Sequence, residues 1–190
     1  EIYSDENRTP LPLSEIPDFI KNATISIEDK NFYHHNGFSI SGITRAAWET
    51  LFHKQIQGGS TITQQLIKST LLNSEISLNR KLKELILAFW AEQLYTKNQI
   101  LEMYLNQVSY GGTAWGIESA SQTYFGISAK KVSLGQAAFL AGLPQAPSEY
   151  SPFSGNKEEA IQRQHEVLRR MLEDGYITQE EAQKAKDEDL

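Results

Sequence analysis

Residues 82–95 read LKELILAFWAEQLY, and their apolar side chains recur at intervals of three and four residues. This spacing puts them on one side of an α-helix. The chain has no proline between Pro17 and Pro144, and no stretch alternates apolar and polar residues strongly enough to form a sheet. We therefore predict a mainly α single domain. The apolar positions of this helix are Leu82, Leu85, Ile86, Phe89, Trp90 and Leu94.

Several helix starts can be placed from the sequence, because Ser and Thr are good N-caps. A Ser or Thr followed three residues later by Gln or Glu has capping-box spacing, in which each side chain bonds the other residue's backbone N–H. Ser60 follows two glycines and is the expected N-cap of a helix that runs from about Thr61. The capping-box pairs are Thr96 with Gln99, Ser133 with Gln136, and Thr178 with Glu181.

The composition fits one globular domain and excludes several classes of protein. The chain has 190 residues, of which 39% are hydrophobic and 22% are charged, so it can bury a core. It has no cysteine, which excludes disulfides and thiolate metal sites. Its net charge of −6 argues against general nucleic-acid binding. Residues 44–97 are nevertheless net basic, and we expect them to meet an anion by direct contact.

The first polar motif is SIEDKNFYHHNGF, residues 26–38, in which acidic residues precede an aromatic-rich turn. A carboxylate among aromatic side chains can have its proton affinity set by desolvation, as a general acid or base requires. The alternative is a helix end with a solvated Glu28. A zinc site built from His34, His35 and Glu28 is a weaker interpretation, because adjacent histidines project in different directions.

The second motif is GGSTITQQLIKSTLL, residues 58–72. On the expected helix, Thr61, Gln64 or Gln65, and Lys68 form a polar stripe. A helix N-terminus with hydroxyls and a lysine can face a phosphate. The stripe is equally compatible with an exposed polar face. The Gly-x-x-x-x-Gly-Lys order of a Walker A loop is absent.

The third motif, NRKLKELI at residues 79–86, opens the long apolar helix. Arg80 and Glu84 are i, i+4 neighbours, with Lys81 beside them. One interpretation is a surface ion pair that contributes under about 0.5 kcal/mol. The other is a second carboxylate, held ionised by cations that could receive an anionic leaving group.

In their order along the chain these motifs, with KNQILEMYLNQVSYGG and QAAFLAGLPQAPSEYSP after them, resemble the peptidoglycan glycosyltransferase domain, glycosyltransferase family 51. That domain occurs in class A penicillin-binding proteins and monofunctional transglycosylases. The resemblance runs from about Leu11 to Gly175. It implies a lysozyme-like fold with a larger head lobe and a smaller membrane-facing jaw lobe. Residues 38–57 would belong to the jaw, and residues 176–190 would begin a linker to a following domain.

The resemblance implies polymerisation of lipid II into glycan strands, with inversion at the sugar C1. Glu28 matches the family's base, which deprotonates the 4-hydroxyl of the incoming lipid II. Glu84 matches the second carboxylate, which assists departure of the donor pyrophosphate. The phosphate-binding positions are matched by Lys68, Arg80 and Lys81. Other substrate-binding or motif-shaping positions are matched by Asp29, Phe32, His35, Ser60, Thr61 and Gln65.

The resemblance also implies the partners: lipid II, the growing glycan chain, the outer leaflet of the cytoplasmic membrane and moenomycin-type inhibitors, with no nucleic acid. No cofactor is required, although Mg²⁺ or Mn²⁺ at the donor pyrophosphate fits the chemistry. Because the chain starts at Glu1 and has no apolar span, we expect a membrane helix before it that anchors the domain outside the cytoplasm. Ile76 and Ser109 depart from the family pattern, and we expect activity to survive both departures, with altered donor affinity or weakened moenomycin binding.

Two other functions are compatible with paired carboxylates and a helical fold. An inverting, lysozyme-like hydrolase also uses two carboxylates. Its leaving group is a neutral sugar hydroxyl, however, so it has no need for the basic cluster of Lys68, Arg80 and Lys81. The second alternative is a catalytically silent glycan-binding domain.

Overall fold

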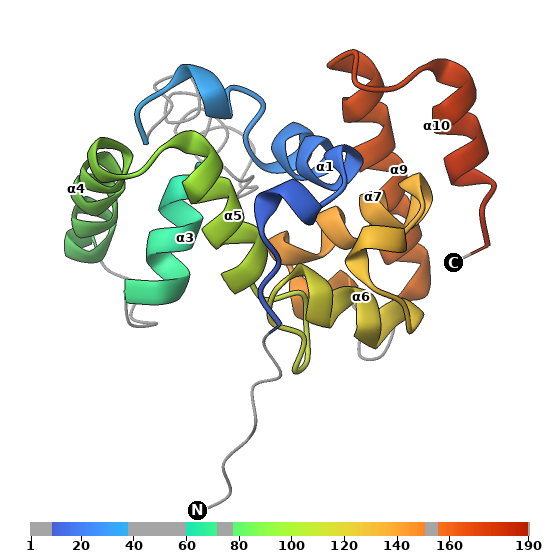
Figure 1. The fold of residues 1–190 in the computed structure, drawn as a ribbon, viewed down its shortest axis with the longest axis horizontal. Helices are drawn as coiled ribbons and strands as arrows, with labels where there is room; N and C mark the ends of the chain where they lie inside the picture. Colours follow the sequence, from blue (N-terminus) through green and yellow to red (C-terminus); the bar gives the residue numbers. More distant parts are fainter. Residues whose placement is uncertain (1–8, 38–59, 72–77, 151–155, 190) are drawn as a thin grey trace, which may run out of the picture. The chain divides into compact units, whose positions relative to one another are not determined.

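The computed structural model describes residues 9–37, 60–71, 78–150 and 156–189. This part of the chain is helical and contains no strand, only an isolated antiparallel bridge between Ser109 and Trp115. The mainly α fold predicted from the sequence is therefore confirmed (Figure 1). The chain divides into two compact units, one formed by residues 28–104 and the other by residues 1–27 with 105–190.

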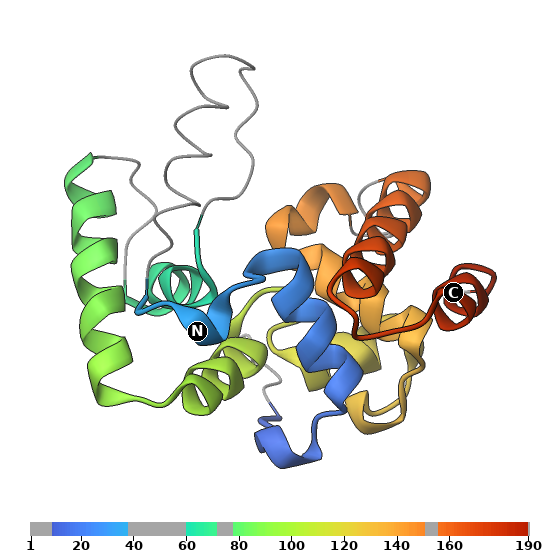
Figure 2. The ribbon, with the colours of Figure 1, turned by 90° about the horizontal axis from the view of Figure 1, so that it is seen from above.

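The unit of residues 28–104 is built around two helices that pack on each other, α3 and α4, and Figure 2 shows them side by side. A short 3₁₀ turn precedes them, and a further helix follows after a capping box at Thr96, where Gln99 N–H and Thr96 Oγ1 lie 3.3 Å apart. The elements are η2 (Phe32–His34), α3 (Ile62–Leu71), α4 (Leu78–Leu94) and α5 (Lys97–Gln107), the last of which continues past residue 104.

Helix α3 starts one residue later than the sequence predicts, because Thr61 and not Ser60 is its N-cap. The carbonyl of Thr61 accepts the first helical hydrogen bond, from Gln65 N–H at 2.9 Å. Thr61 Oγ1 accepts from Gln64 N–H at 3.2 Å, and Gln64 Oε1 accepts from Thr61 N–H at 3.4 Å. The reciprocal bond explains the shift: Gln64 stands three residues after Thr61, so only Thr61 completes a capping box.

Helix α4 buries Glu84 and turns much of its apolar face outward. Its buried positions include Glu84 and Ala88, at 2% and 0% exposure. The predicted helix is confirmed, but most of the apolar stripe that predicts it is solvent-exposed. This reverses the usual arrangement, in which an amphipathic helix buries its apolar face. The exposed side chains are Leu82, Ile86, Phe89, Trp90 and Leu94.

Gly37 allows the turn after η2 to lie directly against α4. Its φ of 83° is in the left-handed region, and a Cβ at this position would come within 2.8 Å of the Ala88 carbonyl oxygen. Any other residue would be strained and would also clash. The close approach places the Gly37 carbonyl where it accepts from Thr61 Oγ1 at 2.8 Å and Gln64 Nε2 at 3.2 Å.

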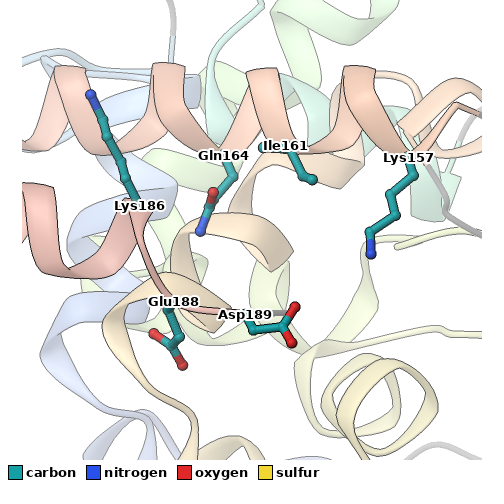
Figure 3. A pocket seen from close by; sticks show the side chains of 6 residues that line it. All are labelled: Lys157, Ile161, Gln164, Lys186, Glu188 and Asp189. Atoms are coloured by element: carbon teal, nitrogen blue, oxygen red, sulfur yellow. The ribbon is translucent and has the colours of Figure 1, made fainter.

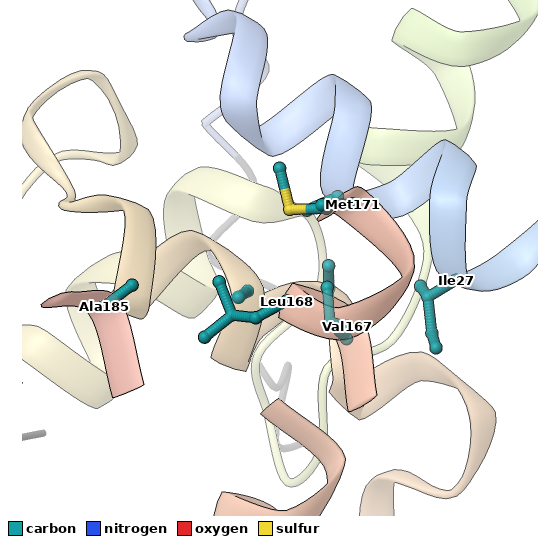
Figure 4. Close-up of a cluster of buried hydrophobic side chains, with 8 residues drawn as sticks. Ile27, Val167, Leu168, Met171 and Ala185 are labelled. Carbon is teal, nitrogen blue, oxygen red and sulfur yellow. The ribbon is translucent and has the colours of Figure 1, made fainter. Parts of the chain in front are cut away.

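The other unit packs α7 against α9 around a small-residue core (Figure 4). The predicted capping boxes at Ser133 and Thr178 are both present. The core cluster consists of Ala23, Ile27, Ala138, Ala141, Val167, Leu168, Met171 and Ala185. The elements of this unit are η1 (Leu13–Glu15), α1 (Asp18–Glu28, whose last residue opens the first unit), α6 (Ile117–Phe125), η3 (Ala129–Lys131), α7 (Leu134–Gly142), η4 (Leu143–Gln145), α8 (Pro147–Tyr150), α9 (Lys157–Glu173) and α10 (Gln179–Lys186).

A pocket in this second unit lies between α9 and the end of the chain (Figure 3). Two lysines and two carboxylates line it, so it offers no excess of either charge to a ligand. None of the residues expected in a functional site belongs to it. The lining residues are Lys157, Ile161, Gln164, Lys186, Glu188 and Asp189.

Candidate active site

Glu28, the first expected carboxylate, ends α1 and is half-buried. Gln65 on α3 donates from Nε2 to Glu28 Oε2 at 2.6 Å. The same amide accepts at Oε1 from the hydroxyl of Tyr104 on α5, at 3.2 Å. A neutral amide therefore holds Glu28 through a short hydrogen bond that adds no positive charge. The alternative of an ordinary solvated helix end is wrong for this residue.

Asp29, next to Glu28, joins the aromatic turn to the start of α3. Its two carboxylate oxygens lie 2.9 and 2.8 Å from His35 Nε2, and Oδ2 accepts from Ile62 N–H at 3.1 Å. Phe32, which is fully buried, packs edge-on against the His35 ring at 6.3 Å between centroids. A carboxylate at a helix N-terminus is also favoured by the helix dipole. Asp29 thus holds the turn of Phe32 and His35 against α3.

Glu84, the second expected carboxylate, is buried and paired with a lysine. Its exposure is 2%, and its Oε1 accepts from the Nζ of Lys81, one turn earlier on α4. Lys81 Nζ also donates to Ser60 Oγ at 3.0 Å and to Gln64 Oε1 at 3.4 Å. The Lys81 side chain as a whole is 47% exposed, whereas that of Glu84 is 3% exposed. The interpretation of Glu84 as a surface ion-pair member is therefore wrong.

The polar stripe of α3 is buried at its start and exposed at its end. Thr61 and Gln64 are buried, with exposures of 2% and 1%, whereas Lys68 in the last turn is exposed. The adjacent residues Gln64 and Gln65 reach different carboxylates, Gln65 directly and Gln64 through Lys81. One helix therefore connects the surroundings of Glu28 to those of Glu84.

All of the expected site residues fall within the unit of residues 28–104. Arg80 is half-buried in the first turn of α4, and Lys68 is exposed on α3, the helix that packs on α4. The unit therefore gathers three carboxylates and three cations on neighbouring elements. The set is Glu28, Asp29, Phe32, His35, Ser60, Thr61, Gln65, Lys68, Arg80, Lys81 and Glu84.

Sequence reasoning missed a supporting network behind this site. Glu92 on α4 accepts from Thr63 Oγ1 and pairs with Lys97 Nζ at 2.8 Å. Lys97 Nζ also lies 4.5 Å from the centroid of the Phe32 ring. The network ties α3, α4 and α5 to the aromatic turn. One signal could have indicated it, since Glu92 directly follows the apolar run at residues 85–91.

Comparison with protein families assigns this chain to a family. A family model described as transglycosylase matches residues 1–172. The chain belongs to the transglycosylase family. This confirms the family and the enzyme class that the motifs predict, a transglycosylase, and it disfavours the hydrolase and silent-domain alternatives.

The transglycosylase chain is similar to several proteins named penicillin-binding protein 1A. It is 44% identical to that of Rickettsia bellii over 98% of the chain, and 46% identical to that of Aquifex aeolicus over 95%. The chain covers 24% and 25% of these two proteins, about a quarter of their length. The crystal structure of penicillin-binding protein 1A from Haemophilus influenzae matches with a TM-score of 0.56 and 25% identity, over 95% of this chain and 17% of that one.

Some predictions fall on residues that the structure does not describe. The expected jaw segment, residues 38–57, and Ile76 lie outside the described residues. Ser109 is described, and its backbone bridges to Trp115 in the unit that does not contain Glu84. Within the described residues no helix is both long and apolar enough to cross a bilayer.

Proposed function

We propose that this domain polymerises lipid II, with Glu28 as general base and the Lys81–Glu84 pair at the leaving pyrophosphate. The observation that carries the proposal is the difference between the two carboxylates. Glu28 is held by the neutral amide of Gln65, whereas Glu84 is held by the ammonium of Lys81. A neutral partner suits a carboxylate that accepts a proton, which is the role of Glu28. A cationic partner suits a group that binds an anion, which is the role of the Lys81–Glu84 pair.

In the proposed reaction, the 4-hydroxyl oxygen of the acceptor sugar attacks C1 of the lipid-linked donor. Its proton passes to a carboxylate oxygen of Glu28, and the bond between C1 and the pyrophosphate oxygen breaks with its electron pair on that oxygen. The hydrogen bond from the Gln65 amide supports the ionised form of Glu28, which is the form that accepts a proton.

The leaving pyrophosphate needs positive charge fixed in place before it departs. The buried Glu84 carboxylate holds the ammonium of Lys81, whose side chain is partly exposed. Lys68 and Arg80 lie on the same pair of helices and complete the proposed phosphate site. In this scheme Glu84 anchors the cation and transfers no proton.

The oxygens around Lys81 do not fit a divalent metal. Ser60 Oγ, Gln64 Oε1 and Glu84 Oε1 all point to the Lys81 ammonium, which occupies the position that a metal bound by them would need. The set also holds only one carboxylate, whereas Mg²⁺ and Mn²⁺ favour oxygen ligands with more negative charge. We propose that lysine supplies this charge without Mg²⁺ or Mn²⁺.

The substrate is lipid-linked, so the proposal places the domain at the outer leaflet of the cytoplasmic membrane, attached by an N-terminal helix. The apolar face of α4 supports contact with a lipid surface. Phe89 and Trp90 are 41% and 59% exposed there, and the basic residues Lys81 and Lys83 lie near its start. Exposed aromatic and aliphatic residues with flanking lysines are typical of helices that lie in a membrane interface. A moenomycin-type phosphoglycolipid would compete for the same proposed phosphate site.

The experiment compares the wild-type domain with Glu28→Gln on labelled lipid II, with polymer separated by gel. Loss of a general base should reduce the rate by about 10²- to 10⁴-fold. Finished peptidoglycan serves as the second substrate, since a hydrolase would release soluble fragments from it. Equal polymerisation by both proteins would refute the role of Glu28, and fragment release without polymer would refute the proposed reaction.

A further inference from the structure

We propose that Tyr104 is a positioning residue for Glu28 and that it acts through the amide of Gln65. The inference rests on the proposed role of Glu28 as the base. It concerns the Tyr104 hydroxyl, which donates a hydrogen bond to the Gln65 amide.

The three groups form a chain of hydrogen bonds from three different helices. Tyr104 on α5 is fully buried, and its hydroxyl donates to Gln65 Oε1 at 3.2 Å. Gln65 on α3 donates from Nε2 to Glu28 Oε2 at 2.6 Å, at the end of α1. The chain runs in one direction, from hydroxyl to amide to carboxylate. Every donor in it points toward the negative charge of Glu28.

The direction of this chain matters because an amide has one accepting side and one donating side. When Tyr104 donates to the Gln65 oxygen, the NH₂ group faces Glu28 and supports the ionised carboxylate. The opposite orientation would turn the amide oxygen toward Glu28 and would suit only a protonated carboxyl. Hydrogen bonds in a chain also polarise one another, so the hydroxyl strengthens the bond between Gln65 and Glu28. Tyr104 therefore favours the ionised form, which is the form that can accept a proton.

The test replaces Tyr104 by phenylalanine, which keeps the buried ring and removes the hydroxyl. The matched control is Tyr124→Phe, because the Tyr124 hydroxyl also donates a partly buried hydrogen bond, to the Tyr110 carbonyl at 2.7 Å, in the unit that contains no expected site residue. The acid limb of the pH profile is the range in which the polymerisation rate falls as the pH is lowered. For Tyr104→Phe we expect the midpoint pH of this limb to rise by about 0.5 to 1 unit, with a plateau rate within about threefold of wild type. The control should leave the acid limb in place.

A double-mutant cycle with Gln65→Leu tests whether Tyr104 acts through Gln65. Gln65→Leu should itself move the acid limb upward, and adding Tyr104→Phe should then produce no further shift. An unchanged acid limb in Tyr104→Phe, or an equal shift with and without Gln65, would overturn the inference. If Tyr104→Phe does not fold, the test is the acid limb of Gln65→Leu alone. An acid limb that does not move upward in Gln65→Leu would show that Gln65 does not support Glu28, and would overturn the inference.

The inference can also be measured without catalysis. ¹³C-NMR of the domain with labelled glutamate follows the titration of Glu28, assigned by its loss in Glu28→Gln. Its midpoint should rise in Tyr104→Phe and not in Tyr124→Phe. A domain that shows this shift but makes no polymer would contradict the proposed function and leave the positioning role intact. A domain that polymerises lipid II without the shift would contradict the positioning role alone.

Discussion

Breaking the Lys81–Glu84 pair from its two sides should have unequal effects on stability. Lys81→Met keeps the length of the side chain and leaves the carboxylate of Glu84 buried without its ammonium. Glu84→Gln leaves a lysine side chain that is already 47% exposed and whose ammonium still has Ser60 Oγ and Gln64 Oε1 as partners. Loss of Lys81 should therefore destabilise the protein more than loss of the Glu84 charge.

The expected magnitudes follow from the exposures. Removing one partner of a fully buried pair destabilises a protein by about 3–5 kcal/mol, whereas an exposed pair contributes about 0–1 kcal/mol. Glu84 has a side-chain exposure of 3%, but Lys81 is half in water, so solvent screens part of the interaction. We expect Lys81→Met to lower the free energy of unfolding by about 2–3 kcal/mol and Glu84→Gln by about 1 kcal/mol.

Urea unfolding at neutral pH, followed by circular dichroism, measures both values and that of the double variant. Because Lys81→Met with Glu84→Gln removes both charges, the double variant should be more stable than Lys81→Met alone. Equal losses in the two single variants would refute the argument from burial. So would a loss below about 0.5 kcal/mol in Lys81→Met, which would indicate that Glu84 is solvated in solution.

Three further outcomes are expected. Gly37→Ala should lower the free energy of unfolding by about 2–4 kcal/mol, because the left-handed backbone is strained and the new Cβ meets a carbonyl oxygen at 2.8 Å; a loss below 1 kcal/mol in urea unfolding would contradict this. The side-chain hydrogen bond from Arg169 lowers the pKa of Glu166 from 4.5 to about 2, so the stability that Glu166 contributes is present above pH 4.5 and is lost as the pH falls toward 2. The stability difference between wild type and Glu166→Gln, about 1 kcal/mol after screening, should disappear over that interval in acid titrations, and a difference that persists at pH 2 would refute the assignment. Phe89→Ser with Trp90→Ser should weaken sedimentation with anionic liposomes without lowering stability, and unchanged binding would exclude the apolar face of α4 as a lipid contact.

Local patterns in the sequence predict much of this fold, because helix spacing and capping boxes depend on residues a few positions apart. Ser133 with Gln136 and Thr178 with Glu181 form the expected boxes. The start of α3 is wrong by one residue, since two hydroxyls stand side by side and only Thr61 has a glutamine three residues later.

The contacts of the site depend on tertiary packing and could not be predicted in the same way. The motifs indicate Glu28 and Glu84, and the structure gives each a different partner. Tyr104 gives no local signal, because a tyrosine within an apolar helix face has the same pattern whether or not its hydroxyl reaches Gln65. The inward and outward faces of α4 are likewise set by α3 and the turn at Gly37, which packing brings together.

Gln64 and Gln65 are consecutive residues, and this adjacency limits how the two halves of the site can change independently. Successive side chains of an α-helix leave the axis about 100° apart, so one peptide step of α3 fixes the angle between the contact to Glu28 and the contact to Lys81. Rotation or sliding of α3 would displace both contacts together. Changes that retune the site for another acceptor or donor sugar should therefore arise in α1, α4 or α5, where one contact can move while the other stays.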